Sequence, residues 1–477
     1  MSKEKTVLIF GAGATAALGM PLTEKQNDFF RTFFFSDVTD LKNYGLTEQD
    51  VERFAALKKL KAEDEFNIED LINFVKYFFI EDEESFKMID LYNLIDIQIH
   101  KGLNLTMHKS ISNEKKILYP HHLVQYRKGI LVVLQEYFSM QIKKAQQNKK
   151  IHLYVDFFQE IGKVLLQEKG ELISDGLDLR DSDFVFSNFS YLSFNWDVLL
   201  LWSMFIAHKN LNDQNAFYYH NQKRMFKLKV FNDFATFMTS KSFDKDTAKW
   251  YPYNESVAYR LNDPDRNTDR KVVLIPTFFP HGQTNWLDCP YCGKLSAYLG
   301  DCFKLQSNSL AMRSPLTADD YYKCVHCGSK LTTKDSAMLL QTLYKSKTPY
   351  LEEIQRAMRI KVEEAKCLIF IGYSLPEDDI DYKSFFRSAK TVHDKKVFVV
   401  LMGNGFEYRW YEAVEVLNMI SDDINKEVIL RYCEIFGKKN VLISMVGFPT
   451  AMDLVTSLVK KNLSSDALIK LATGGGS

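Results

Sequence analysis

The chain has 477 residues, of which 46% are hydrophobic and 26% charged, so it is long enough and apolar enough to bury a sizeable core. Lys plus Arg and Asp plus Glu number 61 each. This balance argues against a strongly basic surface, and we expect no direct nucleic-acid binding. No run of about 18 uncharged apolar residues occurs, so we expect no membrane span. The polar N-terminus does not resemble a signal peptide, and we expect a cytoplasmic location.

The first expected strand leads into a glycine turn. Residues 6–10 form a short apolar run, which is typical of a strand buried on both faces. The turn Gly11-Ala12-Gly13-Ala14 follows, and residues 15–18 predict the start of a helix. Glycines let the backbone approach a pyrophosphate, and a helix N-terminus offers free N–H groups. Because the third glycine of the usual dinucleotide fingerprint is missing, a bare tight turn between strand and helix is an equally good interpretation.

The rest of the chain separates into a helical segment and an alternating segment. Residues 25–180 are poor in Gly and Pro, carry apolar residues at helical spacing and predict a large helical insertion. Strands should then alternate with helices, which predicts an α/β fold with a Rossmann-like parallel sheet. The expected domains are a Rossmann domain made of 1–24 with 181–470, the insertion, and a disordered tail at 471–477. The expected strands of the alternating segment are 184–194, 271–279, 367–372, 397–402 and 441–446.

Four of the seven cysteines form two tight pairs. Cys289 and Cys292 make one Cys-x-x-Cys pair, and Cys324 and Cys327 make the other. Two such pairs supply four thiolates for tetrahedral Zn²⁺, and a closed four-thiolate shell leaves no open position for catalysis. We therefore expect a structural zinc in a ribbon-like module over residues 286–330. Two unrelated buried pairs, or a redox pair, are the alternatives, and nearby Cys302 and His326 are expected to be bystanders.

Polar side chains follow three further expected strands. Asn195 and Asp197 can orient a ligand by hydrogen bonds, although a helix cap is an equally ordinary use of these residues. His281 can serve as a general base or as a structural histidine at a strand end. Gly372 and Ser374 lie in a turn that offers donors to a phosphate, or in an ordinary turn. Because ligands of parallel α/β folds bind at the carboxyl ends of strands, we expect one nucleotide site there.

The order of these motifs resembles that of the sirtuin superfamily. Gly-Ala-Gly, Asn-x-Asp, His-Gly, two Cys-x-x-Cys pairs and Gly-x-Ser-Leu follow one another, and Gly19-Met20-Pro21 matches the family's Gly-Ile-Pro element. The resemblance implies that NAD is the substrate, that Asn195 and Asp197 orient the nicotinamide ribose and water, and that His281 is the general base. It also implies that the NAD-binding residues are Gly11, Ala12, Gly13, Thr15, Pro21, Gly372, Ser374 and Asn404, the last at the adenosine ribose.

Three departures from the family pattern bear on the reaction. Leu22-Thr23 replaces the Phe-Arg pair of the deacylases, Phe194 replaces a Gln, and the helical insertion is long. These features resemble bacterial defence-associated sirtuin-like proteins, which deplete cellular NAD. The resemblance therefore implies an NAD glycohydrolase activated by homo-oligomerisation or by a partner protein, such as a defence-system ATPase or a nucleic-acid-guided sensor. An NAD-dependent protein deacylase and a non-enzymatic nucleotide sensor remain alternatives.

Overall fold

The computed structural model describes most of the chain. The longer described ranges are 5–62, 65–79, 86–108, 115–213, 272–297, 349–377, 379–388 and 395–460. Shorter pieces are 84, 219–220, 223–224, 227–229, 238–241, 249–250, 263, 265, 322–324, 327–331, 336–340 and 342. The expected tail at 471–477, Cys302 and His326 lie outside the described residues.

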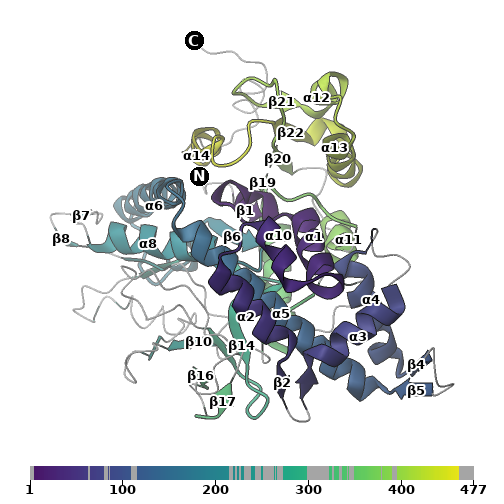
Figure 1. Cartoon of the computed structure of the whole chain (residues 1–477). Coiled ribbons are helices and arrows are strands. Elements are labelled where there is room, and N and C mark those ends of the chain that lie inside the picture. The colour runs from purple at the N-terminus through teal and green to yellow at the C-terminus, as the bar shows by residue number, and fades with distance from the viewer. Residues whose placement is uncertain are drawn as a thin grey trace.

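A mostly parallel sheet forms the centre of the molecule (Figure 1). Within the described residues it has seven strands, and all pair in parallel except the edge strand β21. Adjacent strands are in register, so that Ile9 lies opposite Leu192 on one side and Phe370 on the other. The three central strands are buried along their whole length, as expected for a sheet covered on both faces. In spatial order the strands are β13 (Thr277–Phe278), β6 (Phe189–Ser193), β1 (Thr6–Phe10), β19 (Cys367–Ile371), β20 (Lys396–Val400), β22 (Val441–Ser444) and β21 (Tyr411–Glu412).

The chain reverses its direction across the sheet between β1 and β19. It adds β6 and then β13 on one side of β1, and then returns to add β19, β20 and β22 on the other side. The chain that leaves the carboxyl end of β1 therefore crosses to one side of the sheet, and the chain that leaves the carboxyl end of β19 crosses to the other side. In open α/β sheets, ligands bind in the crevice outside such a point. The fold thus places the glycine turn after β1 and the turn after β19 at this position.

The segment between β1 and β6 is mainly helical. Two small hairpins interrupt it, β2 (Lys61–Ala62) with β3 (Phe66–Asn67) and β4 (Leu105–His108) with β5 (Lys115–Leu118). Its longer helices are α1 (Thr23–Phe35), α2 (Glu48–Lys58), α3 (Ile68–Phe79), α4 (Met88–Lys101), α5 (Pro120–Gln146) and α6 (Ile151–Ser174), which lie beside and below the sheet in Figure 1. The aromatic ring of Phe158 on α6 packs edge-on against Phe10 of β1 and Tyr191 of β6, at 5.8 and 5.5 Å between centroids. The helical segment and the sheet therefore share one continuous hydrophobic core.

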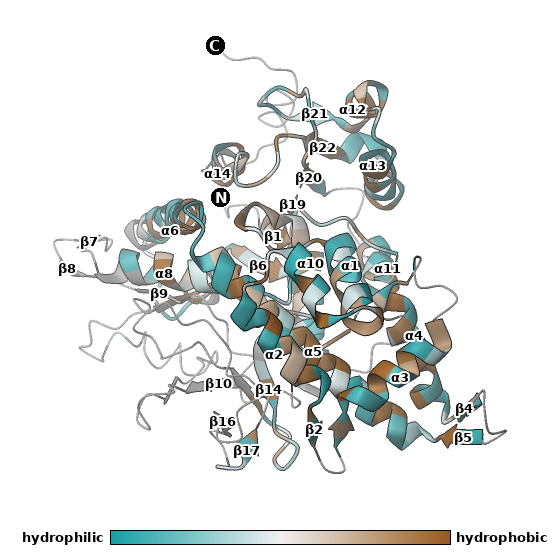
Figure 2. Cartoon of the chain, in the orientation of Figure 1, coloured by the Kyte–Doolittle hydropathy of each residue, from teal (hydrophilic) through white to brown (hydrophobic). Residues whose placement is uncertain are grey.

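The remaining helices cover the later strands. Figure 2 shows hydrophilic and hydrophobic stripes on α13, the pattern of a helix with one face on the core. These helices are α7 (Ser182–Val185), α8 (Leu199–Asp213), α10 (Pro349–Glu364), α11 (Ile380–Ser388), α12 (Ala413–Met419), α13 (Asp423–Phe436) and α14 (Met452–Lys460). No helix of the described residues combines the length and the apolar content that crossing a bilayer requires.

A second sheet carries the cysteine-bearing segment. Its strands in spatial order are β11 (Lys249–Trp250), β10 (Met238–Lys241), β15 (Leu295–Ala297), β14 (Gly282–Asp288) and β18 (Ser336–Met338). A short hairpin, β16 (Tyr322–Lys323) with β17 (Lys330–Leu331), lies beside it and bears the second cysteine pair. Because β14 begins one residue after His281, this sheet continues directly from the central one.

Three sequence expectations about local structure are wrong. The expected strand 184–194 is shorter than predicted, because its first residues lie in the helix α7 (Ser182–Val185) and β6 covers only Phe189–Ser193. Residues 15–18 do not begin an α-helix: the 3-10 turns Ala12–Ala14 and Ala16–Leu18 follow the strand, and left-handed Gly19, at φ 95°, ends the second turn before α1 begins at Thr23. The expected strand 271–279 is divided, because Pro276 has no N–H to donate and separates β12 (Val272–Leu274) from β13. The carbonyl of Pro276 still accepts from the N–H of Tyr191, which keeps β13 beside β6.

Candidate functional site

The glycine turn packs directly on the turn after β19. The N–H of Gly11 donates to the carbonyl of Ile371 at 3.0 Å, and that of Gly13 donates to Gly372 at 2.8 Å. Gly372 has a φ of +61°, and a Cβ there would lie 2.3 Å from the nitrogen of Ala14. A Cβ on Gly13 would likewise lie 2.9 Å from Gly372 Cα. The glycines at these positions are therefore required by the contact between the two turns.

The same contacts use several of the N–H groups that the sequence assigns to a phosphate. The N–H of Ala14 donates to Gly11, and that of Thr15 donates to Ala12, in addition to the bonds of Gly11 and Gly13. Ala12 is exposed at the tip of the turn. In this conformation, the turn would approach a pyrophosphate mainly through its tip.

Thr15 links the glycine turn to the end of β6. Its hydroxyl donates to Asp197 Oδ2 at 3.0 Å and accepts from Asn195 Nδ2 at 3.3 Å, and all three side chains are buried. The other oxygen of Asp197 accepts from the N–H of Leu199, the first residue of α8. Asp197 thus serves the helix start, the alternative use that the sequence left open. Asn195 Oδ1 is buried without a hydrogen-bond partner.

Burial changes the acid–base behaviour of Asp197. It raises the pKa of this carboxyl to about 6, although the hydrogen bonds from Leu199 and Thr15 act in the opposite direction. At pH 7 the group is therefore mostly ionised, and it holds a proton in about a tenth of the molecules.

His281 contacts the backbone of Phe194, the residue that precedes Asn195. Its Nδ1 is 3.2 Å from the carbonyl oxygen of Phe194, and its Nε2 is 3.4 Å from Asp379 Oδ1. The second contact is at ion-pair distance but lacks hydrogen-bond geometry, so Nε2 makes no hydrogen bond. The hydroxyl of Tyr373 donates to the other oxygen of Asp379 at 2.6 Å. The sequence did not assign a role to Asp379 or Tyr373, because nothing local shows that they meet His281.

Aromatic rings close around the imidazole. Phe194, which stands where the resemblance expects Gln, stacks on Tyr373 with 4.4 Å between ring centroids and an angle of 9°. It also meets His281 and Tyr382 edge-on at 5.1 and 4.8 Å. Burial raises the pKa of Tyr373 and that of Tyr382 well above the usual range, so both hydroxyls stay neutral. The result is a low-dielectric environment around His281 and Asp379.

Three of the predicted site residues lie apart from this cluster. Pro21 is buried and its carbonyl accepts from Gln26 Nε2 at 3.2 Å. Ser374 is exposed and its carbonyl accepts from Arg431 Nε at 3.2 Å. Asn404 is exposed in the loop after β20. The structure thus brings Gly11, Gly13, Thr15, Asn195, Asp197, His281 and Gly372 together.

Side chains of the helical segment hold the glycine turn and its surroundings. Tyr154 on α6 donates to the carbonyl of Ala14 at 2.7 Å, and Asn148 donates to that of Ala17 at 3.3 Å. Gln135 on α5 donates to the carbonyl of Thr284, and Gln283 donates to that of Asp197. The sequence gave no sign of these contacts, since each joins residues far apart in the chain.

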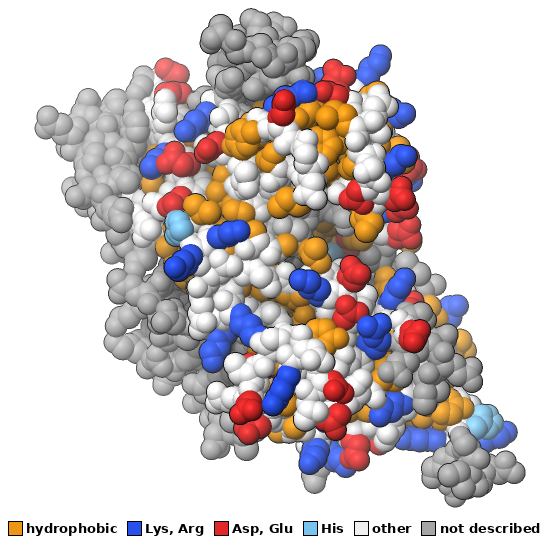
Figure 3. Space-filling model, turned by 45° about the horizontal axis from the view of Figure 1, so that its top comes forward, with side chains coloured by type: hydrophobic (Ala, Val, Ile, Leu, Met, Phe, Trp, Pro, Cys, Tyr) orange, Lys and Arg blue, Asp and Glu red, His pale blue; other side chains and the backbone are white. Residues whose placement is uncertain are grey.

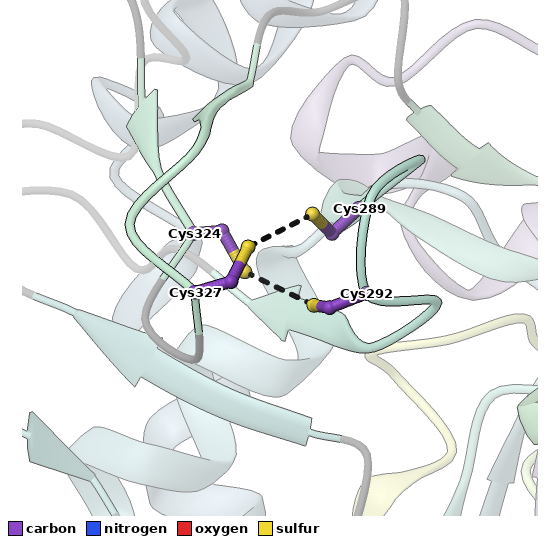
Figure 4. A group of neighbouring side chains, drawn as sticks. All are labelled: Cys289, Cys292, Cys324 and Cys327. Carbon is purple, nitrogen blue, oxygen red and sulfur yellow. Dashed lines mark hydrogen bonds between the residues drawn. The ribbon is translucent and has the colours of Figure 1, made fainter.

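The four paired cysteines converge, as Figure 4 shows. Their sulfur atoms all lie within 4.8 Å of one another, and Cys289–Cys327 and Cys292–Cys324 are each 3.6 Å apart. Tetrahedral zinc with bonds of about 2.3 Å requires sulfurs about 3.8 Å apart, so the cluster could bind a metal such as zinc. Ser329 hydrogen-bonds to Cys327 and lowers the pKa of its thiol to about 6, which favours the thiolate that a metal needs.

The two cysteine knuckles have the same backbone design. The N–H of Gly293 donates to the carbonyl of Cys289, and the N–H of Gly328 donates to that of Cys324, each at 2.8 Å. Both glycines have positive φ, at 64° and 78°, which turns the chain back within each knuckle. The cluster is built by β14, β15 and the β16–β17 hairpin, outside the strand ends that carry His281 and Asn195.

No model of a known protein family matches the sequence, and comparison with curated proteins found no relative.

Proposed function

We propose that this protein is an NAD glycohydrolase with a sirtuin-like Rossmann domain, which cleaves the nicotinamide–ribose bond to give nicotinamide and ADP-ribose. The order of the parallel strands supports the fold assignment. Numbered along the chain, β13-β6-β1-β19-β20-β22 corresponds to the order 3-2-1-4-5-6 of doubly wound dinucleotide-binding sheets. The glycine turn lies at the crevice where such sheets bind the pyrophosphate.

One observation carries the proposal. Asn195 and His281 follow two adjacent parallel strands, and each keeps a buried polar atom without a hydrogen-bond partner, Asn195 Oδ1 and His281 Nε2. Nδ1 of His281 lies against the backbone of Phe194, the residue before Asn195. A buried polar atom without a partner costs about 1–3 kcal/mol, and such atoms are rare in folded proteins. A ligand hydroxyl or a water molecule that hydrogen-bonds to both atoms explains why the protein keeps these two polar atoms buried without a protein partner.

The chemistry suits this pair. Breaking the nicotinamide–ribose bond produces an oxocarbenium-like transition state, and nicotinamide leaves as a neutral group. The protein must hold water or a ribose hydroxyl in attack geometry and remove its proton. Asn195 performs the first task through its amide, and His281 performs the second as the general base.

The other predicted residues bind or support the dinucleotide. Gly11, Ala12 and Gly13 approach the pyrophosphate, Gly372 and Ser374 line its pocket, and Asn404 reaches the adenosine ribose. Thr15 and Asp197 support Asn195 rather than contacting the ribose, because their polar atoms bond to one another and to Leu199. The four cysteines hold a structural Zn²⁺, remote from the reacting atoms.

We further propose that the enzyme is a cytoplasmic, NAD-depleting effector of bacterial anti-phage defence. Its activity is gated by homo-oligomerisation or by a partner protein, such as a defence-system ATPase or a nucleic-acid-guided sensor. The helical segment offers a route for such control, since Tyr154 bonds to the glycine turn and Asn148 bonds to Ala17 just after it. A direct role for nucleic acid is not favoured: on the face of the described residues seen in Figure 3, Lys and Arg side chains are interspersed with Asp and Glu side chains.

The test is release of nicotinamide and ADP-ribose from NAD by the purified protein, alone and with the products of neighbouring genes. Asn195→Ala and His281→Ala should each lower turnover by about 100-fold or more while the fold is kept. His152→Ala is the matched control, because this histidine is exposed on α6 and should leave turnover unchanged. Wild-type turnover in both site variants would refute the assignment. Nicotinamide release only with an acetyl-peptide would indicate a deacylase, and NAD binding without release would indicate a sensor.

A further inference from the structure

Both ring nitrogens of His281 face oxygen atoms of the protein. Nδ1 lies 3.2 Å from the carbonyl oxygen of Phe194, and because a carbonyl only accepts hydrogen bonds, Nδ1 must carry the hydrogen. Nε2 lies 3.4 Å from Asp379 Oδ1. The side chains of His281 and Asp379 are only 8% and 2% exposed, so both are shielded from bulk solvent.

This arrangement leaves His281 without an available basic nitrogen. With Nδ1 protonated, only the lone pair of Nε2 can accept a proton from a ligand. Nε2 faces Asp379 Oδ1 instead of a ligand, so its lone pair is not presented for proton transfer. Nε2 can accept a proton from a ligand only after it moves away from Asp379.

Asp379 is held in place from several sides. Tyr373 donates to its second oxygen at 2.6 Å, and Tyr373 is itself fixed by the stack on Phe194. Tyr382, the other titratable side chain packed against the imidazole, has its ring centroid 5.2 Å away and is neutral because burial raises its pKa well above the usual range.

The loop that carries Asp379 contains an unusual backbone position. Within the described residues, Leu375 is the one non-glycine residue with positive φ, at 50°, and its side chain is fully buried. This conformation is costly for a residue with a Cβ and persists only where the surroundings enforce it. The loop is therefore held in a conformation that brings Asp379 to the imidazole.

We propose that Asp379 is a positioning residue that holds His281 in a resting arrangement, and that turnover requires Nε2 to exchange Asp379 for the hydroxyl of the ligand. This inference rests on the proposed function, in which His281 is the general base. It gives the resting enzyme a means of sparing NAD that is built into the site itself. Binding of a partner to the loop, or to the helices around it, would then act by moving Asp379 away.

The first test does not depend on activity. Nitrogen-15 NMR of the histidine side chains, with His281→Ala to assign the signal, reports whether Nε2 is protonated. Asp379→Asn should shift the Nε2 signal of His281, because Nε2 then faces an uncharged amide in place of the carboxyl group that lies 3.4 Å away in the wild type. Asp381→Asn, an exposed carboxylate two residues away, should leave the signal unchanged. A signal insensitive to Asp379→Asn would overturn the inference.

The second test is NAD turnover without any activating partner. Asp379→Asn should raise basal turnover about tenfold, within the range usual for coupling between two states of a site. Tyr373→Phe keeps the stacking on Phe194 and removes the hydroxyl, so it should give a smaller rise, and His281→Ala combined with Asp379→Asn should abolish the gain. A fall in turnover with Asp379→Asn would show that Asp379 assists the reaction and would refute the resting role. If no variant or wild type releases nicotinamide, the proposed function fails while the NMR result still decides whether Asp379 holds the ring.

Discussion

Replacing Asp197 with Asn should change how the stability of the protein depends on pH. Asp197 is 4% exposed, and burial raises its pKa from 3.8 to about 6. The folded state therefore binds this proton more tightly than the unfolded chain does. The contribution of Asp197 to the free energy of unfolding is most favourable below about pH 4. It is lost as the pH rises through 6, because the folded protein must then bury the charged carboxylate.

The size of the effect follows from the two pKa values. A rise from 3.8 to about 6 corresponds to about 3 kcal/mol of unfolding free energy, of which about 2 kcal/mol falls between pH 4 and pH 7. Asn preserves the local bonds, since its carbonyl oxygen can accept from Leu199 and its amide can donate to Thr15. The Thr15 hydroxyl then turns to the carbonyl of Ala12, which lies 3.5 Å away. Asn carries no titrating proton, so the variant does not lose unfolding free energy at this position as the pH rises.

The assay is urea unfolding of wild type and Asp197→Asn at several pH values between 4 and 8. The variant should gain about 2 kcal/mol relative to wild type between pH 4 and pH 7. Taking the difference at each pH cancels the other titrating groups. Asp156→Asn, which replaces an exposed carboxylate on α6 away from the site, is the matched control. A constant difference for Asp197→Asn, or a variant that loses stability as the pH rises, would refute the reasoning.

Three further predictions test other parts of the structure. If the cysteine cluster holds zinc as proposed, Cys292→Ser should lower the metal content of the purified protein and its unfolding temperature. Cys433→Ser, at a buried cysteine of α13 outside the cluster, should leave the metal content unchanged. Gly372→Ala should lower the free energy of unfolding in urea by more than about 3 kcal/mol, since the added Cβ would lie 2.3 Å from the nitrogen of Ala14. Gly405→Ala is the control: Gly405 has a φ of +79° and no atom within 4 Å of the added Cβ, so the change should cost only the backbone strain of about 1–2 kcal/mol. Tyr154→Phe should leave the carbonyl of Ala14 without its donor, lower the free energy of unfolding by about 1–3 kcal/mol and raise the KM for NAD. Tyr291→Phe, at an exposed tyrosine of the first cysteine knuckle, should change neither the free energy of unfolding nor the KM.

Local patterns in the sequence predicted the features that depend on neighbouring residues. The strands at 6–10 and 367–371 are continuous apolar runs, which only a strand buried on both faces explains, and the structure has them at nearly the expected bounds. The cysteine cluster was predictable for the same reason, since two short knuckles impose the ligand geometry. Helices α11 and α13 escaped prediction because charged residues interrupt their apolar positions, and only packing on the sheet selects them.

The candidate site was predictable only in part. Asn195 and His281 follow apolar strands, and the rule that ligands bind at strand ends was enough to place them near each other. Their partners could not be found this way. Asp379 contacts His281 because β19 pairs with β1 and the loop after β19 brings Asp379 to the residue that follows β13. Local sequence patterns predict neither the strand order nor the path of this loop. In the sequence, the replacement of a Gln by Phe194 was only a departure from the deacylase pattern, but in the structure the ring stacks on Tyr373 and packs edge-on against the imidazole.

The helical segment is closely joined to the site. Its length and composition predicted a large helical insertion, and in the structure its aromatic side chains complete the core of the sheet. Tyr154 bonds to the backbone of the glycine turn, and Asn148 bonds to the carbonyl of Ala17 just after it. A partner or second copy that shifts α6 would therefore move Ala14, and with it Thr15 and the amide of Asn195. Because a packed core transmits small displacements instead of absorbing them, a binding event on these helices can reach the strand ends without a separate relay. If assembly acts through α6 as proposed, it would control the position of Asn195 while Asp379 controls that of His281, and full activity would require both halves of the site to be released.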